Sequence, residues 1–297
     1  MRLDLALIAR HPGLSRRKAQ AAIEKGQVLV DGRVALAPGA DVGPQDEVRW
    51  EENRKALPRR HASLPLLHAD PYLLVVDKPS GLLSVRTSPE AAHEDTLLAR
   101  VKAYVAKARR GGYVGCVHRL DRDTSGAIAF ALTPQVHASL RVMFRAHRVE
   151  RRYLALVRGA PRKPSGTIGT PIHDAYRSGR RRLARPGEPS HEAVTHYQVL
   201  EALPRVSLVE VSLETGRQHQ IRLHLDSLGI PVLGDKVYGV SRGPRAPIAA
   251  HRQMLHARLL AFSHPVTGER VRVESPLPED FAQALAAARA PAGRDRS

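Results

Sequence analysis

The sequence of 297 residues contains one cysteine, Cys116. A single cysteine can form neither a disulfide within the chain nor a cysteine-based zinc site, and such usage is typical of a reducing compartment. The sequence also lacks an apolar run of the length that spans a bilayer. The short apolar run over 5–9 lies next to Asp4 and does not have the pattern of a signal peptide. These absences predict a cytoplasmic protein that does not enter a membrane.

Acidic residues are few relative to basic ones, with 29 Asp and Glu against 47 Lys and Arg and a formal net charge of +18. Such an excess favours a polyanionic partner such as nucleic acid. A proteome rich in arginine would give the same excess without that partner, so charge alone does not decide. Hydrophobic residues make up 42% of the chain, which is enough for one large domain and a small one.

Residues 1–50 have the pattern of a small separate domain in the order helix, helix, hairpin. Ser15 is placed to cap a second helix over 16–25, and Gly26 to end it. The apolar residues at 28–30 and the turn Asp31-Gly32 then predict a hairpin. The pattern over 3–34 resembles the RNA-binding domain shared with ribosomal small-subunit protein four.

Basic residues crowd the first turn of that second helix, where the helix dipole disfavours cations. A solvated surface would tolerate them because salt screens their repulsion, whereas a phosphate-binding surface would explain them. The candidate RNA contacts in this domain are Arg16, Arg17, Lys18, Lys25 and Arg33.

The remaining chain divides into three parts. Residues 51–65 are charged, contain proline and lack periodicity, which predicts a linker, and 290–297 are expected to be a disordered tail. Over 66–289, strands and helices are mixed without strict alternation, which predicts an α+β fold. Asp95 and Thr133 are each placed to cap a helix, and a further helix is predicted over 219–228.

The densest polar segment is HRLDRDTSG at 118–126, between two predicted apolar strands. Three interpretations are open: a surface loop whose charges pair locally, a metal-dependent nuclease, or one catalytic carboxylate flanked by cations. The nuclease is disfavoured because Asp121 and Asp123 supply too few ligands for a metal. In an extended segment they would also point to opposite faces.

HRLDRDTSG resembles the signature of the RluA-type pseudouridine synthases, H-R-L-D-x-x-T-S-G. Other motifs similar to those of that family stand in the family's order, namely DKPSGLL at 77–83, RYLALV at 152–157, TGRQHQIRLH at 215–224, GIPVLGDKVYG at 229–239, and LHA at 255–257 with His264-Pro265. Many members carry the same small RNA-binding domain in front. The sequence departs from the family at 84–87, where SVRT replaces an apolar-His-Pro continuation, and this bears on substrate choice.

The resemblance implies an isomerase that converts uridine to pseudouridine in structured RNA, with large-subunit ribosomal RNA as the first expectation and transfer RNA as an alternative. It also implies a mixed, mainly antiparallel central sheet with flanking helices and a catalytic cleft. The reaction is redox-neutral, so we expect no metal and no cofactor. We expect a monomer without an obligate protein partner. A non-catalytic, RNA-binding ribosome assembly factor on the same scaffold is the alternative function.

The resemblance also implies roles for single residues. Asp121 matches the family's essential aspartate, which can stabilise positive charge at C1′ of the ribose, attack C1′, or remove a proton from C2′. Arg222 matches the arginine that pairs with this carboxylate, although an ordinary helical pair with Asp226 is possible. Tyr153 matches the tyrosine that stacks on the target base, although a core position would also suit it. Arg119 matches the arginine that fills the gap left by the flipped base, with phosphate contact as the alternative.

The histidines of these motifs do not have zinc-ligand spacing, so we predict that they support the cleft. Further residues predicted at the substrate site are His118, Thr124, Ser125, Gly216, Arg217, His219 and Ile221. An arginine-rich stretch over 177–185 is predicted to be a mobile loop; a solvated charge run is its simplest explanation, and phosphate contact becomes the better one if the substrate is RNA. The candidate RNA contacts in this stretch are Arg180, Arg181 and Arg182.

Overall fold

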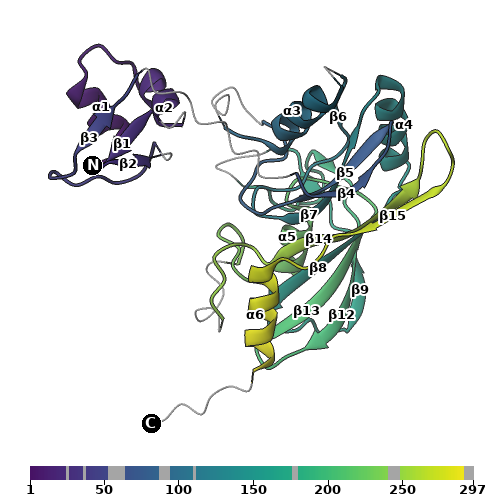
Figure 1. Cartoon of the computed structure of the whole chain (residues 1–297). Coiled ribbons are helices and arrows are strands. Elements are labelled where there is room, and N and C mark those ends of the chain that lie inside the picture. The colour runs from purple at the N-terminus through teal and green to yellow at the C-terminus, as the bar shows by residue number, and fades with distance from the viewer. Residues whose placement is uncertain are drawn as a thin grey trace, which may run out of the picture. The chain divides into compact units, whose positions relative to one another are not determined.

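The computed structural model describes residues 1–24, 27–35, 38–52, 64–86, 94–109, 112–175, 180–239 and 248–290 (Figure 1). The chain forms two compact units, Met1–Ser63 and Leu64–Ser297. Most of the predicted linker, 53–63, and most of the predicted tail, 291–297, lie outside the described residues. Each unit has its own hydrophobic core, so each is described by itself.

The smaller unit contains the expected two helices and hairpin. Helices α1 (Leu3–Arg10) and α2 (Arg16–Glu24) pack on a three-stranded sheet of β1 (Val28–Val30), β2 (Arg33–Ala35) and β3 (Val48–Trp50), in the order β2-β1-β3. The hairpin is confirmed, because Asp31 and Gly32 both have positive φ, as a tight turn between twisted strands requires. Ser15 caps α2 by accepting a hydrogen bond from the backbone N–H of Lys18 at 3.3 Å.

The larger unit is built on one ten-stranded sheet with the order β4-β5-β7-β14-β8-β13-β12-β9, to which β15 adds beside β14 and β6 beside β7. Among its described strands β14 and β7 pair in parallel, and the other pairs are antiparallel, which confirms the expected mixed, mainly antiparallel sheet. The strands are β4 (Leu66–Ala69), β5 (Leu73–Lys78), β6 (Gly115–Cys116), β7 (Ser125–Ala131), β8 (Glu150–Arg158), β9 (Ser165–Ile168), β12 (Thr195–Ala202), β13 (Val206–Leu213), β14 (Leu255–Ser263) and β15 (Arg270–Glu274). A separate two-stranded sheet pairs β10 (Ile172–His173) with β11 (Ser190–His191).

Four helices cover the two faces of the large sheet. Successive side chains of a strand point to opposite faces. Helices α3 (Leu97–Arg109) and α5 (Gln220–Ser227) share one core with Val76, Ile128 and Tyr153. Helices α4 (Pro134–Arg145) and α6 (Glu279–Arg289) pack on the opposite face, against alternate residues such as Ala129 and Leu154. Tyr153 therefore points to the face that carries α5.

In the larger unit, one of the two predicted helix caps is confirmed and the other is wrong. Thr133 caps α4, since its hydroxyl accepts a hydrogen bond from the N–H of Val136 at 3.2 Å. Asp95 does not cap α3; the hydroxyl of Thr96 accepts from the N–H of Ala99 at 3.2 Å instead. Asp95 pairs with Arg100 on the surface. Thr96 directly precedes the helix and is buried, so it is better placed for the role.

Candidate active site

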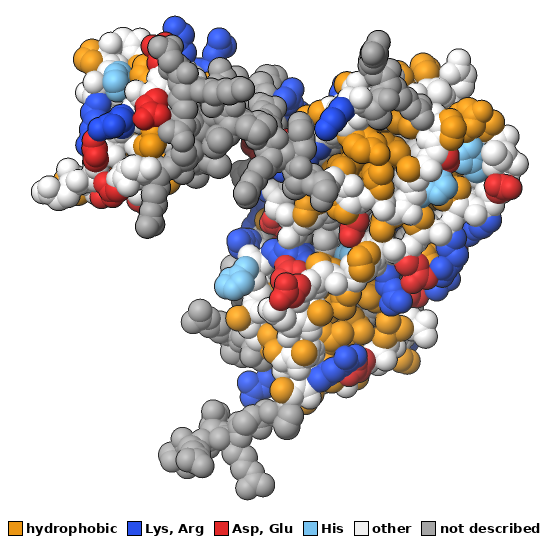
Figure 2. All heavy atoms as spheres, viewed as in Figure 1, with side chains coloured by type: hydrophobic (Ala, Val, Ile, Leu, Met, Phe, Trp, Pro, Cys, Tyr) orange, Lys and Arg blue, Asp and Glu red, His pale blue; other side chains and the backbone are white. Residues whose placement is uncertain are grey.

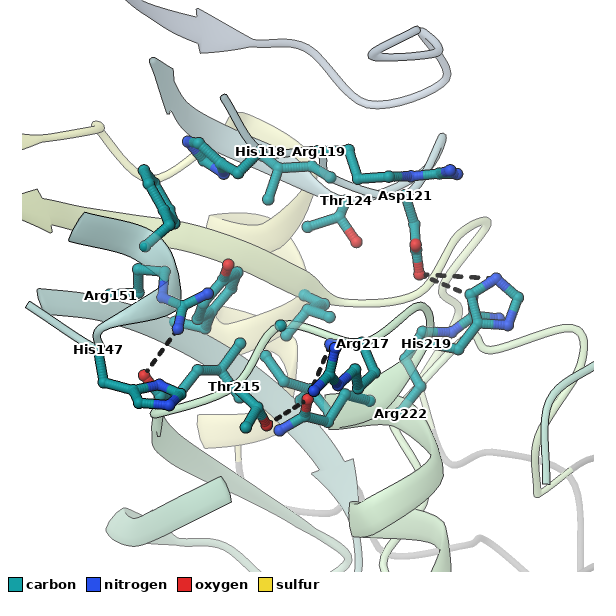
Figure 3. Close-up of a pocket in the computed structure, with 18 of the residues that line it drawn as sticks. His118, Arg119, Asp121, Thr124, His147, Arg151, Thr215, Arg217, His219 and Arg222 are labelled. Carbon is teal, nitrogen blue, oxygen red and sulfur yellow. Dashed lines mark hydrogen bonds and ion pairs between the residues drawn. The ribbon is translucent and has the colours of Figure 1, made fainter. Parts of the chain in front are cut away.

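A cavity of about 340 Å³ in the larger unit gathers residues that are far apart in the sequence (Figure 3). Its walls come from the turn between β6 and β7, the end of α4, the strand β8 and the loop between β13 and α5. Most of the residues predicted at the substrate site line it: His118, Arg119, Asp121, Thr124, Tyr153, Gly216, Arg217, His219, Ile221 and Arg222.

Asp121 and Arg222 meet in this pocket, although 101 positions separate them. Nη1 of Arg222 donates to Oδ2 of Asp121 at 3.0 Å. The side chain of Asp121 is 18% exposed and that of Arg222 is 6% exposed. Among the described residues, no hydrogen bond is made to Oδ1 of Asp121, so this carboxylate keeps acceptor capacity toward the cavity.

A second carboxylate, that of Asp235, also pairs with Arg222. Its Nε and Nη2 donate to the two oxygens of Asp235 at 2.6 and 2.8 Å, and the side chain of Asp235 is fully buried. Oδ1 of Asp235 also accepts the backbone N–H groups of Val237 and Tyr238. Burial opposes the charge of Arg222, but Asp235 and Asp121 outweigh it and raise the pKa of the guanidinium. Arg222 thus pairs with Asp121 and Asp235, and not with Asp226 as the helical spacing had allowed.

Tyr153 fills the core and also lines the pocket. It is 7% exposed and lies in the core shared with α5, so a core position and a place on the pocket wall occur together, and stacking on a base stays a prediction. Burial raises the pKa of its phenol, although the charge of Arg151 opposes that shift. The hydroxyl therefore keeps its proton at neutral pH.

Two histidines of the motifs support the pocket in different ways. His118 stacks on Phe144 with ring centroids 4.7 Å apart, and its Nε2 accepts the N–H of Ala129 at 3.1 Å. Burial lowers the pKa of His118 to about 3, so its ring is neutral. His219 has a φ of 61°; its Nδ1 lies 3.0 Å from the hydroxyl of Tyr238 and its Nε2 3.9 Å from Oδ2 of Asp121.

His224 lies apart from these two and bonds to Thr195 and to the carbonyl of Thr170. In the ranges that the structure describes, no three His, Cys, Asp or Glu side chains are grouped as metal ligands would be. No described helix is both long and apolar enough to cross a bilayer.

Ser125 is the predicted substrate residue that the pocket does not include. Its hydroxyl lies 3.0 Å from Nδ1 of His256, and both side chains are buried. Thr124, one position earlier, lines the pocket and accepts a hydrogen bond from Gln253 at 2.7 Å. Because Ser125 begins β7, strand alternation turns its side chain to the opposite side of the sheet.

Two residues that sequence reasoning left without a role hold the turn of Asp121 in place. Lys78 is fully buried, and its ammonium donates to the carbonyls of Pro79, Leu82 and Arg122 at 2.9, 2.7 and 2.8 Å. The hydroxyl of Ser84 donates to the carbonyl of Leu120 at 2.7 Å and accepts its N–H at 3.0 Å. Lys78 belongs to the DKPSGLL motif and Ser84 opens the stretch that departs from the family, and these were the signals available in the sequence.

The candidate RNA contacts fall into three groups. Lys25 and the side chain of Arg33 lie outside the described residues. Arg16 pairs with the buried carboxylate of Asp4 at 3.1 Å, while Arg17 and Lys18 are exposed. In the arginine-rich stretch, 176–179 lie outside the described residues. Arg180, Arg181 and Arg182 are described: the first two bond to Val237 and Gln218, and Arg182 pairs with Glu188 at 2.5 Å.

Comparison with known proteins agrees with this architecture. A family model described as RNA pseudouridylate synthase matches residues 72–227, and an S4 domain model matches residues 1–48. The ribosomal large subunit pseudouridine synthase D of Pseudomonas aeruginosa is 37% identical, over 94% of this chain and 89% of its own length. The protein of the same name from Xanthomonas campestris is 36% identical, over 99% and 90%.

Among solved structures, human RNA pseudouridylate synthase domain containing 4 superposes with a TM-score of 0.61 at 26% identity, over 76% of this chain and 93% of its own. The matched regions define an enzyme that isomerises uridine in RNA, preceded by a small RNA-binding domain. The chain belongs to the RNA pseudouridylate synthase family.

Proposed function

We propose that this protein converts specific uridines of large-subunit ribosomal RNA to pseudouridine, with Asp121 as the catalytic carboxylate. The observation that carries the proposal is the contact between Asp121 and Arg222 at 3.0 Å, in a pocket that Tyr153 also lines. The names of the relatives support a ribosomal substrate, and the S4 match over residues 1–48 supports RNA binding. Transfer RNA is the alternative substrate.

The reaction breaks the bond between N1 of uracil and C1′ of ribose and forms one between C5 and C1′. The proton on C5 is lost and N1 gains one, so the isomerisation is balanced without an oxidant or a reductant. Departure of the base makes C1′ electron-poor. A carboxylate at Asp121 would stabilise that centre, attack it, or remove the C2′ proton. Arg222 keeps the carboxylate aimed at the cavity in each case, because a guanidinium pairs strongly with a carboxylate in a partly buried site.

The other pocket residues would bind the extruded nucleotide. A uridine in a folded RNA must leave its stack to reach Asp121, which costs a few kcal/mol. Tyr153 would stack on the base, and Arg119 would enter the space that the base leaves. The remaining predicted substrate contacts are His118, Thr124, Gly216, Arg217, His219 and Ile221. The exposed cations Arg17, Lys18, Arg180 and Arg182 would contact phosphates. We further propose that the enzyme acts in the cytoplasm as a monomer without a cofactor.

The test compares pseudouridine maps of ribosomal RNA from cells that carry the wild-type gene, no gene, or the variant Asp121→Ala. Loss of the same pseudouridines in the last two strains is the expected result, with RNA binding by Asp121→Ala nearly unchanged. Asp123→Ala is the matched control, because Asp123 lies in the same turn but does not line the pocket. An unchanged map without the gene would indicate a non-catalytic assembly factor. Release of free uracil would indicate a glycosidase, and loss of activity with a chelator a nuclease.

A further inference from the structure

The pocket has two chemically different ends (Figure 3). Asp121, His219 and Arg222 lie at one end, and Arg151 and His147 lie at the other. Arg145, two residues before His147, also lines the cavity. On the face of the larger unit shown in Figure 2, basic and acidic side chains are mixed. The pocket differs, because five arginines but only two acidic residues line it.

Arg151 is a buried cation that meets no carboxylate within the described ranges. It is 7% exposed, and Nη2 donates to the carbonyls of Leu213 and Glu214 at 3.2 and 2.6 Å. Among the described residues it forms no ion pair, and its buried Nε has no hydrogen-bond acceptor. A guanidinium removed from water without a counter-ion is costly, and burial indeed lowers the pKa of Arg151. The site as described therefore lacks an anion.

The neighbouring groups do not supply that anion. The carboxylate of Glu214 is turned to His196 at 2.6 Å, and only its backbone carbonyl meets Arg151 and His147. Of the two acidic residues of the pocket, Asp121 is engaged by Arg222. The other is Glu192, which is exposed.

Gly216 gives the guanidinium of Arg151 its space. A Cβ at position 216 would lie 2.7 Å from Nη1 of Arg151, with the next atom of any kind 3.9 Å away. Gly216 lies in the loop that leads through Arg217 to α5. It also lines the same pocket as Arg151. The lack of a side chain at 216 thus leaves Nη1 in position on the pocket wall.

We propose that Arg151 binds the phosphodiester group next to the uridine whose sugar faces Asp121. This rests on the proposed function, which makes RNA the substrate. The phosphodiester is the anion that RNA carries at every residue, and a planar guanidinium matches its two free oxygens. The contact would fix the strand at one end of the pocket while Asp121 acts at the other, so it positions the substrate and takes no part in bond breaking.

The test uses RNA hairpins that contain a uridine which the wild-type enzyme converts. One hairpin is natural RNA. In the second, an uncharged methylphosphonate replaces the phosphate on the 5′ side of that uridine, and in the third it replaces the phosphate on the 3′ side. For the wild type, one of the two changes should lower kcat/KM about tenfold, mainly through KM, because a hydrogen bond between charged groups is lost. On the natural hairpin, Arg151→Gln should have a kcat/KM about tenfold below that of the wild type. On the hairpin whose methylphosphonate slows the wild type, the kcat/KM of Arg151→Gln should fall no further.

Two further variants keep the result interpretable. Gly216→Ala would displace Nη1 of Arg151 without deleting the arginine, and should reproduce part of the loss if Arg151→Gln does not fold. Arg152→Gln is the matched control, because the next residue along β8 is exposed and pairs with Glu150 and Glu210 at 2.9 and 3.2 Å. This control should respond to both methylphosphonates as the wild type does.

The proposal would be overturned if the losses of kcat/KM from Arg151→Gln and from the methylphosphonate were additive. It would also be overturned if the wild type had the same kcat/KM on all three hairpins. A shift of the pH profile without a change in KM would show that Arg151 acts on the phenol of Tyr153 instead. If the wild type converts no uridine, the proposed function fails separately. The phosphate contact is then read from binding of uridine 3′,5′-bisphosphate, which the wild type should bind about tenfold more tightly than uridine and Arg151→Gln should not.

Discussion

Each unit of this protein contains a buried charge cluster, and the two clusters are built in opposite ways. In the smaller unit one fully buried carboxylate, Asp4, accepts hydrogen bonds from Arg2, Arg16 and Gln20 at 3.0, 3.1 and 2.9 Å. In the larger unit one buried guanidinium, Arg222, is shared by two carboxylates.

The difference indicates that the Asp4 cluster stabilises its unit, whereas the cluster of Asp121, Arg222 and Asp235 leaves a carboxylate available for a reaction. Several donors saturate Asp4, and although burial opposes the charge, they hold the pKa of its carboxyl well below the usual range. Among the described residues, Asp121 accepts one hydrogen bond, from Arg222. The same guanidinium donates two further hydrogen bonds to Asp235. A carboxylate that keeps a free acceptor oxygen is available to a reacting centre, whereas a saturated one is not. Arg16, selected as an RNA contact, thus also has a structural partner.

Apart from the loss of activity in Asp121→Ala, the largest effect is expected at Asp235. Asp235→Asn keeps the shape of the side chain but removes the charge that faces Arg222 and places an amide N–H₂ against the guanidinium. Arg222 would then turn toward Asp121 or leave its position, and pseudouridine formation should fall about 100-fold or more, because breaking a buried ion pair costs about 3–5 kcal/mol. Single-turnover assays with saturating RNA measure this. Wild-type rates in a folded Asp235→Asn protein would show that Arg222 keeps its position with Asp121 as its one carboxylate partner.

The next effect is a pH dependence that comes from Lys78. Burial lowers the pKa of Lys78 to about 7, although the charges of Asp121 and Asp123 oppose the shift. Above pH 7 the amine therefore loses a proton, one of its three carbonyl acceptors loses its donor, and the turn of Asp121 loosens. Activity should fall several-fold between pH 7 and 9.

The stability contribution of Lys78 has the opposite sign. In the unfolded chain a lysine keeps its proton up to about pH 10.4, so between pH 7 and 10 the unfolded state binds more protons than the folded one. The contribution of Lys78 to the free energy of unfolding should rise with pH in this range. Lys78→Met should remove that rise. A rise that persists in the variant would assign it to another group.

A smaller effect, confined to one unit, is expected at Asp4. Asp4→Asn removes the charge shared by three donors and should lower the free energy of unfolding of the smaller unit by about 1–3 kcal/mol. Fluorescence of Trp50, the single tryptophan of the sequence, reports on this unit, to which its strand β3 belongs. Turnover at saturating RNA should stay unchanged. Glu47→Gln is the control, because that side chain is 66% exposed.

The same comparison predicts an acid transition. Because the pKa of Asp4 is lower in the folded state, its stabilisation is present above the ordinary value of about 3.9 and is lost as the pH falls further. Wild-type Trp50 fluorescence should change below pH 4, and Asp4→Asn should have little of this dependence. Equal acid sensitivity of both proteins would contradict this account of the cluster.

The smallest effect is expected at Arg182. Its pair with Glu188 lies at the surface, with side chains 50% and 28% exposed, so Arg182→Gln should change stability by less than about 1 kcal/mol. If Arg182 also contacts RNA, its loss should lower affinity at low salt and reduce the slope of log affinity against log salt by about one. Glu188→Gln frees the arginine and should leave RNA affinity equal or higher. If the slope of log affinity against log salt is the same in Arg182→Gln as in the wild type, Arg182 does not contact RNA and only pairs with Glu188.

The elements that sequence patterns predicted well are those with strong internal signals. The sequence patterns over 206–213 and 270–274 predict two strands, and these ranges match β13 and β15 residue for residue. The strands β4 and β9 were not predicted. They are four residues long and stand at the two ends of the main strand order. Short edge strands contain too little alternation to be recognised and are defined by the strand they pair with.

The sequence by itself determined the family, because the motifs around Asp121, Tyr153 and Arg222 stand in a fixed order that single residues could not provide. It also determined the α+β class and the hairpin at Asp31-Gly32, because local dihedral preferences and apolar spacing act over a few residues. Only the tertiary structure decided that Arg222 pairs with Asp235, that Ser125 faces away from the pocket, and that Arg151 is buried with no counter-ion in the part of the chain that the structure describes. Pairing between segments so far apart depends on the register of the sheet and the packing of α5, which no local stretch of sequence contains.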